Sequence, residues 1–169
     1  MVSATQTFAH RYLVGLGSNR PHPQIGAPRK ILLAALPALE ECGDLAASSP
    51  IIASAPLGPS RRRFANAVAM LDSDLPPRAL LTRLKAIEAE FGHRRGQRWS
   101  ARVLDLDIVL WSGGPFAEPG LIIPHPRFRE RGFVLGPARM LAPHWRDPVT
   151  GLTLAQLDRR LTRPRPLPR

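Results

Sequence analysis

The segment VLDLDIVLW, residues 103 to 111, limits the possible folds more than any other part of the chain. Side chains alternate between the two faces of a β-strand, so apolar residues at every second position predict one buried face. That face consists of Leu104, Leu106, Ile108 and Leu110. Asp105 and Asp107 then share the opposite face. The segment therefore predicts a sheet whose one side packs against a core while its other side carries two carboxylates.

The other segments predict an α+β domain. The chain has 169 residues, enough for one domain with a real core and too few to make two domains the expectation. Helical and extended patterns interleave too irregularly for a parallel doubly wound sheet, so we expect helices packed on a mostly antiparallel sheet. We place the domain at residues 1–160 and expect the proline- and arginine-rich tail, 161–169, to be disordered. Extended segments are expected at 12–16, 46–58, 64–73, 104–111 and 121–123, and helices at 28–42, 76–92 and 154–161.

Charge and composition narrow the classes of function. The formal net charge is +11, which favours polyanionic partners such as nucleic acid or nucleotide phosphates. The only cysteine, Cys42, is expected in the core, and a reducing, cytoplasmic setting fits a chain with no possible intrachain disulfide. We find no export signal and no stretch long and apolar enough for a membrane, and without a heptad seam we take a monomer as the default.

The two aspartates suggest a site for a cation. Their Cβ atoms would lie only about 6–7 Å apart on one face, so either arginines or a cation must offset their repulsion. Magnesium suits such a pair, because it is typically held by one or two carboxylates plus substrate phosphates. A salt-bridged or simply solvated pair is the alternative, since exposed strand faces often carry charges.

Two arginine clusters flank this strand and favour phosphoryl transfer. One surrounds Trp99 in a loop between Gly92 and the strand, and the other follows His125. Metal-binding carboxylates next to arginines are what phosphoryl transfer requires, although no Walker or protein-kinase glycine loop is present. The clusters consist of Arg94, Arg95, Arg98 and Arg102, and of Arg127, Arg129 and Arg131.

Five motifs, in this order, carry a family resemblance: YLVGLGSN, APLG, FANAV, RWSARVLDLDIVLW and IPHPRFRERGFVL. From Tyr12 to Pro143 the chain resembles 6-hydroxymethyl-7,8-dihydropterin pyrophosphokinases. The resemblance implies a ferredoxin-like α+β fold and a role in folate biosynthesis. It also implies transfer of the β,γ-pyrophosphoryl unit of MgATP to the hydroxymethyl group of the pterin, with release of AMP. ATP and the pterin are the expected partners, and neither nucleic acid nor a membrane is expected.

The resemblance also assigns the pterin and metal residues. Asp105 and Asp107 would bind two magnesium ions and act in catalysis. Phe64 and Phe133 would sandwich the pterin ring, although by pattern alone they would be core residues. The resemblance further implies that the edge of the pterin is read by Asn66 and that its pocket is completed by Ser54 and Leu57.

The nucleotide and loop residues are assigned in the same way. His125 and Arg131 match phosphate contacts, while Lys85 and Glu88 fall near nucleotide-binding positions and could equally form a surface ion pair. The remaining matches form a mobile loop that seals the site, with two residues expected to be catalytic and one to contact substrate: Arg95, Arg102 and Trp99.

Other interpretations stay open from the sequence. His93 stands where the family carries an arginine, so a member that binds both substrates but turns over poorly is one alternative. A nucleic-acid-binding protein would explain the basic charge but not the carboxylate pair. A two-metal nuclease would explain the carboxylates but normally needs more acidic ligands.

Overall fold

The computed structural model describes residues 7–55, 63–92 and 103–164. The described strands begin with β1 (His10–Ser18) and end with the short pair β6 (Phe116–Glu118) and β7 (Leu121–Ile123). Between them lie β2 (Asp44–Ser48), β3 (Ile52–Ser54), β4 (Phe64–Ser73) and β5 (Asp105–Trp111). The helices are α1 (Pro28–Ala38), α2 (Pro77–Gly92), α3 (Gly132–Leu141) and α4 (Leu154–Thr162), with 3-10 turns η1 (Leu39–Cys42) and η2 (Phe128–Glu130).

One antiparallel sheet organises the molecule. Its strands follow the order β2-β4-β1-β5, and β3 extends the edge formed by β2 by pairing with β4. Leaving β3 aside, the chain runs β1-α1-β2-β4-α2-β5, which is the ferredoxin-like βαββαβ order. The expected α+β class with a mostly antiparallel sheet is therefore confirmed.

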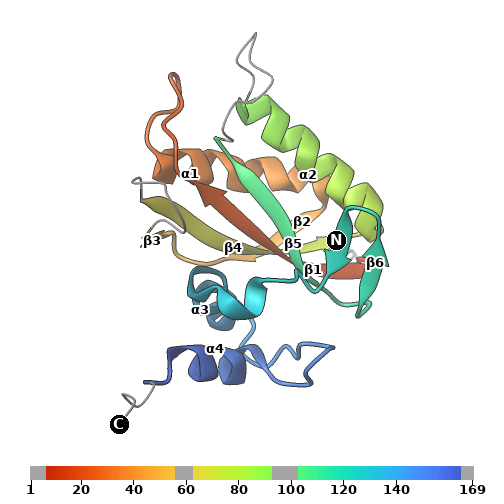
Figure 1. Cartoon of the computed structure of the whole chain (residues 1–169). Helices are drawn as coiled ribbons and strands as arrows, with labels where there is room; N and C mark the ends of the chain where they lie inside the picture. The colour runs from red at the N-terminus through yellow and green to blue at the C-terminus, as the bar shows by residue number, and fades with distance from the viewer. Residues whose placement is uncertain (1–6, 56–62, 93–102, 165–169) are drawn as a thin grey trace, which may run out of the picture.

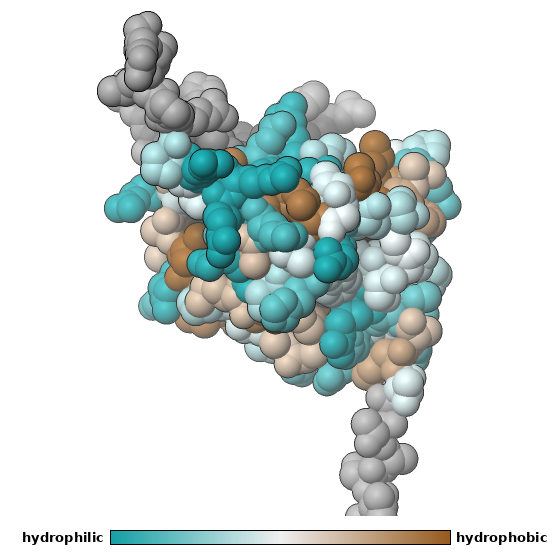
Figure 2. All heavy atoms as spheres, turned by 90° about the horizontal axis from the view of Figure 1, so that it is seen from below, coloured by the Kyte–Doolittle hydropathy of each residue, from teal (hydrophilic) through white to brown (hydrophobic). Residues whose placement is uncertain are grey.

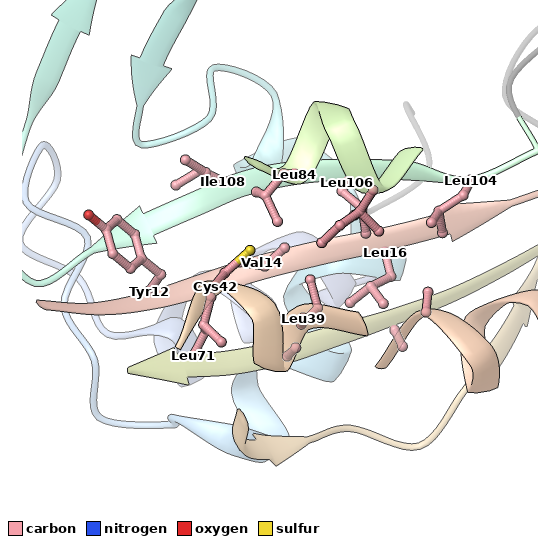
Figure 3. Packing of buried hydrophobic residues seen from close by; sticks show 14 of the residues in the cluster. Tyr12, Val14, Leu16, Leu39, Cys42, Leu71, Leu84, Leu104, Leu106 and Ile108 are labelled. Atoms are coloured by element: carbon pink, nitrogen blue, oxygen red, sulfur yellow. The ribbon is translucent and has the colours of Figure 1, made fainter. Parts of the chain in front are cut away.

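Helices cover both faces of this sheet, α1 and α2 on one side and α3 and α4 on the other (Figure 1). The core under α1 and α2 contains Leu106 and Ile108 from β5 and Leu104, which directly precedes that strand, and Figure 3 shows them among residues of β1, β4 and α2. Cys42 lies in the same core at 4% exposure, as expected, and burial raises the pKa of its thiol. The second core, under α3 and α4, includes Leu13, Val68 and Leu135 from β1, β4 and α3.

A β-bulge in β5 overturns one expectation. Val14 pairs with Ile108 while Leu13 pairs with Leu110, so Val109 is one residue more than β1 can match. The extra residue shifts the alternation of side chains, and both Val109 and Leu110 pack in the second core. The prediction that Leu110 shares a face with the leucines before it was wrong, because strict alternation holds only in a strand without a bulge.

Two helices depart from the sequence pattern in instructive ways. The helix expected over 28–42 ends as α-helix at Ala38, directly after Pro37, and continues as the 3-10 turn η1. Helix α3 was not expected, because Gly136 and Pro137 interrupt its apolar pattern. The expected helix 76–92 is confirmed, and α4 begins with a capping box formed by Thr153 and Gln156.

A buried carboxylate ties the loop before α4 to η2. The Asp147 side chain is fully buried and accepts two hydrogen bonds of 2.7 Å from the Arg129 guanidinium and one of 2.6 Å from Thr150 Oγ1. Burial by itself raises the pKa of Asp147, but these hydrogen bonds outweigh burial and the pKa is lowered overall. The network anchors this loop to the second core.

The surface on the α3 and α4 side is mixed. Among the described residues seen from that side, polar side chains dominate and apolar ones form small, separate groups (Figure 2). No helix within the described ranges combines the length and apolar character that crossing a membrane requires. The end of the predicted disordered tail, residues 165–169, lies outside the described part of the chain.

Candidate active site

A cavity of about 410 Å³ opens on the second face of the sheet, beside the part that α3 and α4 cover. Its floor consists of residues of β1, β4 and β5, and its walls come from the ends of β3 and α3 and from the segment after β7. The lining includes six of the residues singled out in the sequence together with Asp105 and Asp107: Ser54, Phe64, Asn66, His125, Arg131 and Phe133.

Two glycines of β1 form the floor of this cavity. Gly17 lies between Asn66 on β4 and Asp105 on β5, and Gly15 pairs with Asp107. A Cβ atom at Gly17 would lie 3.6 Å from Asn66 Oδ1, so even a methyl group would rise into the space between these strands. The sequence reasoning did not single out these glycines. Their alternation with Val14 and Leu16 was the available signal, because glycine inside a strand often marks the close approach of a ligand.

The carboxylate pair faces the cavity as the alternation predicts. The Asp107 side chain is 36% exposed, and two cationic or polar groups approach it without forming hydrogen bonds. Lys85 Nζ lies 3.9 Å from Oδ1, and His125 Nε2 lies 3.9 Å from Oδ2. At these distances neither Lys85 nor His125 blocks Asp107 from binding a cation, which is compatible with the metal interpretation.

His125 is held with one ring nitrogen toward this carboxylate. Its backbone N–H donates to the Val109 carbonyl at 3.0 Å, and its Nδ1 accepts from the Arg127 backbone N–H at 3.2 Å. Burial lowers the pKa of His125, and the opposing effect of Asp107 does not cancel this, so the ring is neutral at pH 7. With Nδ1 as acceptor, the ring proton resides on Nε2 and is available to an acceptor in the cavity.

An amide and two aromatic rings form the other wall. Asn66 is 5% exposed, and its Nδ2 donates to Ser54 Oγ at 2.7 Å, which orients the amide. Phe64 begins β4, and Phe133 lies in the first turn of α3. The Arg131 guanidinium carbon lies 5.8 Å from the centre of the Phe133 ring, so a cation and a flat apolar surface occur together at this wall.

Lys85 and Glu88 do not line the cavity; they lie beside the outer edge of β5. Lys85 Nζ donates to Glu88 Oε1 at 2.6 Å and to the Leu106 carbonyl at 2.9 Å. Glu88 Oε1 also accepts from the Leu106 backbone N–H at 2.6 Å. Burial raises the pKa of Glu88, although the bonds from Lys85 and Leu106 oppose that rise.

The remaining predicted site residues lie outside the described part of the chain. These are Leu57 and the loop residues His93, Arg95, Trp99 and Arg102.

The donor set suits a hard cation that takes few ligands from the protein. Within residues 7–55, 63–92 and 103–164 no group of three or more histidine, cysteine or acidic side chains is placed to hold a metal ion. Asp105 and Asp107 are the two carboxylates that line the cavity. Magnesium accepts such an arrangement, because it keeps several waters and takes its other ligands from substrate phosphates.

Comparison with known proteins gives a consistent result. The profile of the 7,8-dihydro-6-hydroxymethylpterin-pyrophosphokinase family matches residues 13–143. A Pseudomonas aeruginosa 2-amino-4-hydroxy-6-hydroxymethyldihydropteridine pyrophosphokinase is 45% identical over 82% of this chain and 84% of the relative. A Synechocystis protein of the same name is 36% identical, covering 88% and 74%. The Arabidopsis thaliana mitochondrial folate synthesis bifunctional protein is 35% identical, covering 78% of this chain and 23% of the relative. The chain thus belongs to the 7,8-dihydro-6-hydroxymethylpterin-pyrophosphokinase family.

Proposed function

We propose that this protein transfers the β,γ-pyrophosphoryl unit of MgATP to the hydroxymethyl group of 6-hydroxymethyl-7,8-dihydropterin, as a step of folate biosynthesis. The hydroxyl oxygen attacks the β-phosphorus, the bond between that phosphorus and the α,β-bridging oxygen breaks, and AMP leaves with that oxygen. The hydroxyl proton is released. One observation carries the proposal: the carboxylate pair and the aromatic and amide wall share a single cavity.

The metal and phosphate side of the cavity fits the nucleotide. Asp105 and Asp107 would hold two magnesium ions, which would neutralise the charge that develops on the phosphates during transfer. His125 donates from Nε2 to a phosphate oxygen, and Arg131 offers a guanidinium with planar donor geometry. The family resemblance further implies that Arg95 and Arg102 act in catalysis and that the loop that carries them and Trp99 seals the site.

The opposite wall fits the pterin. A flat ring with hydrogen-bonding groups along its edge needs apolar faces and an oriented amide. Phe64 and Phe133 supply the faces, and Asn66, oriented by Ser54, supplies the amide. Leu57 is proposed to complete the pocket on the resemblance alone.

The experiment is a reaction of purified protein with MgATP and 6-hydroxymethyl-7,8-dihydropterin, followed by chromatography for AMP. We expect AMP only when both the pterin and magnesium are present. AMP without the pterin would indicate simple hydrolysis and would contradict the proposal. Binding of both ligands without AMP would point to His93 in place of the family's arginine as the cause of a disabled reaction, and His93→Arg should then restore it.

A further inference from the structure

We propose that Lys85 and Glu88 are positioning residues that hold the backbone N–H and C=O groups of Leu106 and thereby set the spacing and direction of Asp105 and Asp107. This inference rests on the proposed function, because it concerns how the carboxylate pair receives the metal ions. The family resemblance placed these two side chains near nucleotide-binding positions. In the proposal they act on the nucleotide site indirectly, through the backbone of β5.

The position of β5 in the sheet leaves some of its backbone groups without a strand partner. β5 is an edge strand, since its only strand partner in the described sheet is β1. Every second residue of an edge strand directs its backbone N–H and C=O groups away from the sheet, where no other strand receives them. Leu106 is one of these residues, and its two backbone groups meet α2 instead of a strand.

Two side chains of α2 bind the Leu106 backbone. Glu88 Oε1 accepts the Leu106 N–H at 2.6 Å, and Lys85 Nζ donates to the Leu106 carbonyl at 2.9 Å. The same Lys85 Nζ donates to the same Glu88 oxygen at 2.6 Å. Two hydrogen bonds therefore join the Leu106 backbone to side chains one turn apart on α2, and a third joins these two side chains to each other. The Glu88 side chain is 10% exposed, so water competes little for these bonds.

The Leu106 backbone also sets the direction of the two carboxylates. Leu106 is the single residue between Asp105 and Asp107, so rotation of its backbone changes the direction of both Cα–Cβ bonds at once. A metal site tolerates little such movement, because magnesium demands near-ideal octahedral geometry. On its other face Leu106 is fully buried in the core. Core packing of the side chain and the two hydrogen bonds to α2 thus restrict movement of the Leu106 backbone.

Lys85 contributes a second effect. Its Nζ lies 3.9 Å from Asp107 Oδ1, so it reduces the repulsion between the two carboxylates without forming a hydrogen bond that a metal ion would have to displace. One lysine therefore both binds the backbone and places a positive charge beside Asp107.

The test compares Glu88→Ala with Glu88→Gln and with a matched control, Glu90→Ala, on the exposed side of the same helix. Two measurements are made: amide hydrogen exchange of Leu106 by NMR without metal, and the magnesium concentration that gives half-maximal AMP formation. We expect Glu88→Ala to speed Leu106 exchange at least tenfold and to raise the required magnesium at least fivefold. Glu88→Gln retains an oxygen that accepts from the amide, so both values should stay within twofold, as they should for Glu90→Ala.

Binding of Mn²⁺ together with the α,β-methylene analogue of ATP, followed by EPR, gives a readout that needs no turnover. Weaker Mn²⁺ binding in Glu88→Ala, with the nucleotide affinity restored at saturating metal, is the expected result. Weaker nucleotide binding that persists at saturating metal while Leu106 stays protected would mean direct contact and would overturn the proposal. If Glu88→Ala does not fold, Lys85→Met removes the carbonyl donor and should raise the required Mn²⁺ in the same way. A wild-type protein that makes no AMP would refute the proposed function, while exchange and Mn²⁺ binding would still test the positioning role.

Discussion

Replacing Gly17 with alanine should stabilise the protein and impair substrate binding at the same time. Gly17 lies in the middle of the cavity floor, between Asn66 and Asp105 on the neighbouring strands. Its φ lies outside the left-handed region, so alanine can adopt the same backbone. The added Cβ would contact Asn66 Oδ1 at 3.6 Å, which is an ordinary van der Waals distance. The unliganded fold therefore accepts the methyl group without strain.

The two effects can be given magnitudes. Glycine in a strand interior costs about 0.5–1 kcal/mol relative to alanine, so the free energy of unfolding of Gly17→Ala should rise by about that amount. The same methyl group occupies space that the pterin and MgATP need in the cavity. Overpacking by one such group costs about 1–3 kcal/mol, which corresponds to a loss of affinity of about 5- to 150-fold.

Urea denaturation measures the first effect, and calorimetric titration with 6-hydroxymethyl-7,8-dihydropterin, with magnesium and the α,β-methylene analogue of ATP present, measures the second. Gly136→Ala is the matched control, because a Cβ there contacts nothing within 4 Å and Gly136 lies in α3 away from the cavity lining. The control should gain stability without losing affinity. Wild-type affinity in Gly17→Ala, or a loss of stability above about 1 kcal/mol, would refute the assignment of the floor.

Two further predictions concern acidic residues. Asp105→Ala and Asp107→Ala should each abolish AMP formation while the melting temperature stays within about 4 °C of wild type, and retained activity in both variants would contradict the metal assignment. Asp147→Asn should lower the free energy of unfolding in urea at pH 7 by about 2–4 kcal/mol, because it leaves the Arg129 charge without its carboxylate. The pKa of Asp147 is lowered in the folded state. The ionised carboxylate therefore contributes its full stability above the unfolded pKa of about 3.9, and this stability is lost as the pH falls through the folded-state pKa. The difference in the free energy of unfolding between wild type and Asp147→Asn should thus shrink below about pH 4.

The elements that were predicted well are those in which each residue interacts mainly with its neighbours in the chain. The apolar positions of α2 at helical spacing, and the alternation of Leu106 and Ile108 in β5, depend only on local periodicity, and both patterns hold in the structure. Leu110 broke the alternation because the bulge depends on how β1 pairs with β5, which local periodicity does not encode. Helix α3 was missed for a related reason, since packing on the sheet overrides the weak local pattern around Gly136.

For the site, the sequence supplied candidates but not their arrangement. Ser54 and Asn66 were both assigned to the pterin pocket, yet only the pairing of β3 with β4 brings their side chains within 2.7 Å. Lys85 and Glu88 were recognised as neighbours on one helix face, but their spacing says nothing about the strand that the face meets. Their contact with Leu106 depends on how α2 packs along the edge of the sheet.

By itself, then, the sequence determined the strand that carries two carboxylates, the α+β class and the family, because alternation and motifs are properties of adjacent residues. Only the tertiary structure decided which side chains share the cavity. The pairing of β1 with β4 and β5 puts Gly17 between the Asn66 amide and the Asp105 carboxylate. The packing of α2 places Lys85 and Glu88 beside the outer edge of β5. The physical reason is that register and packing join residues far apart in the chain through backbone hydrogen bonds and burial, which no local pattern specifies.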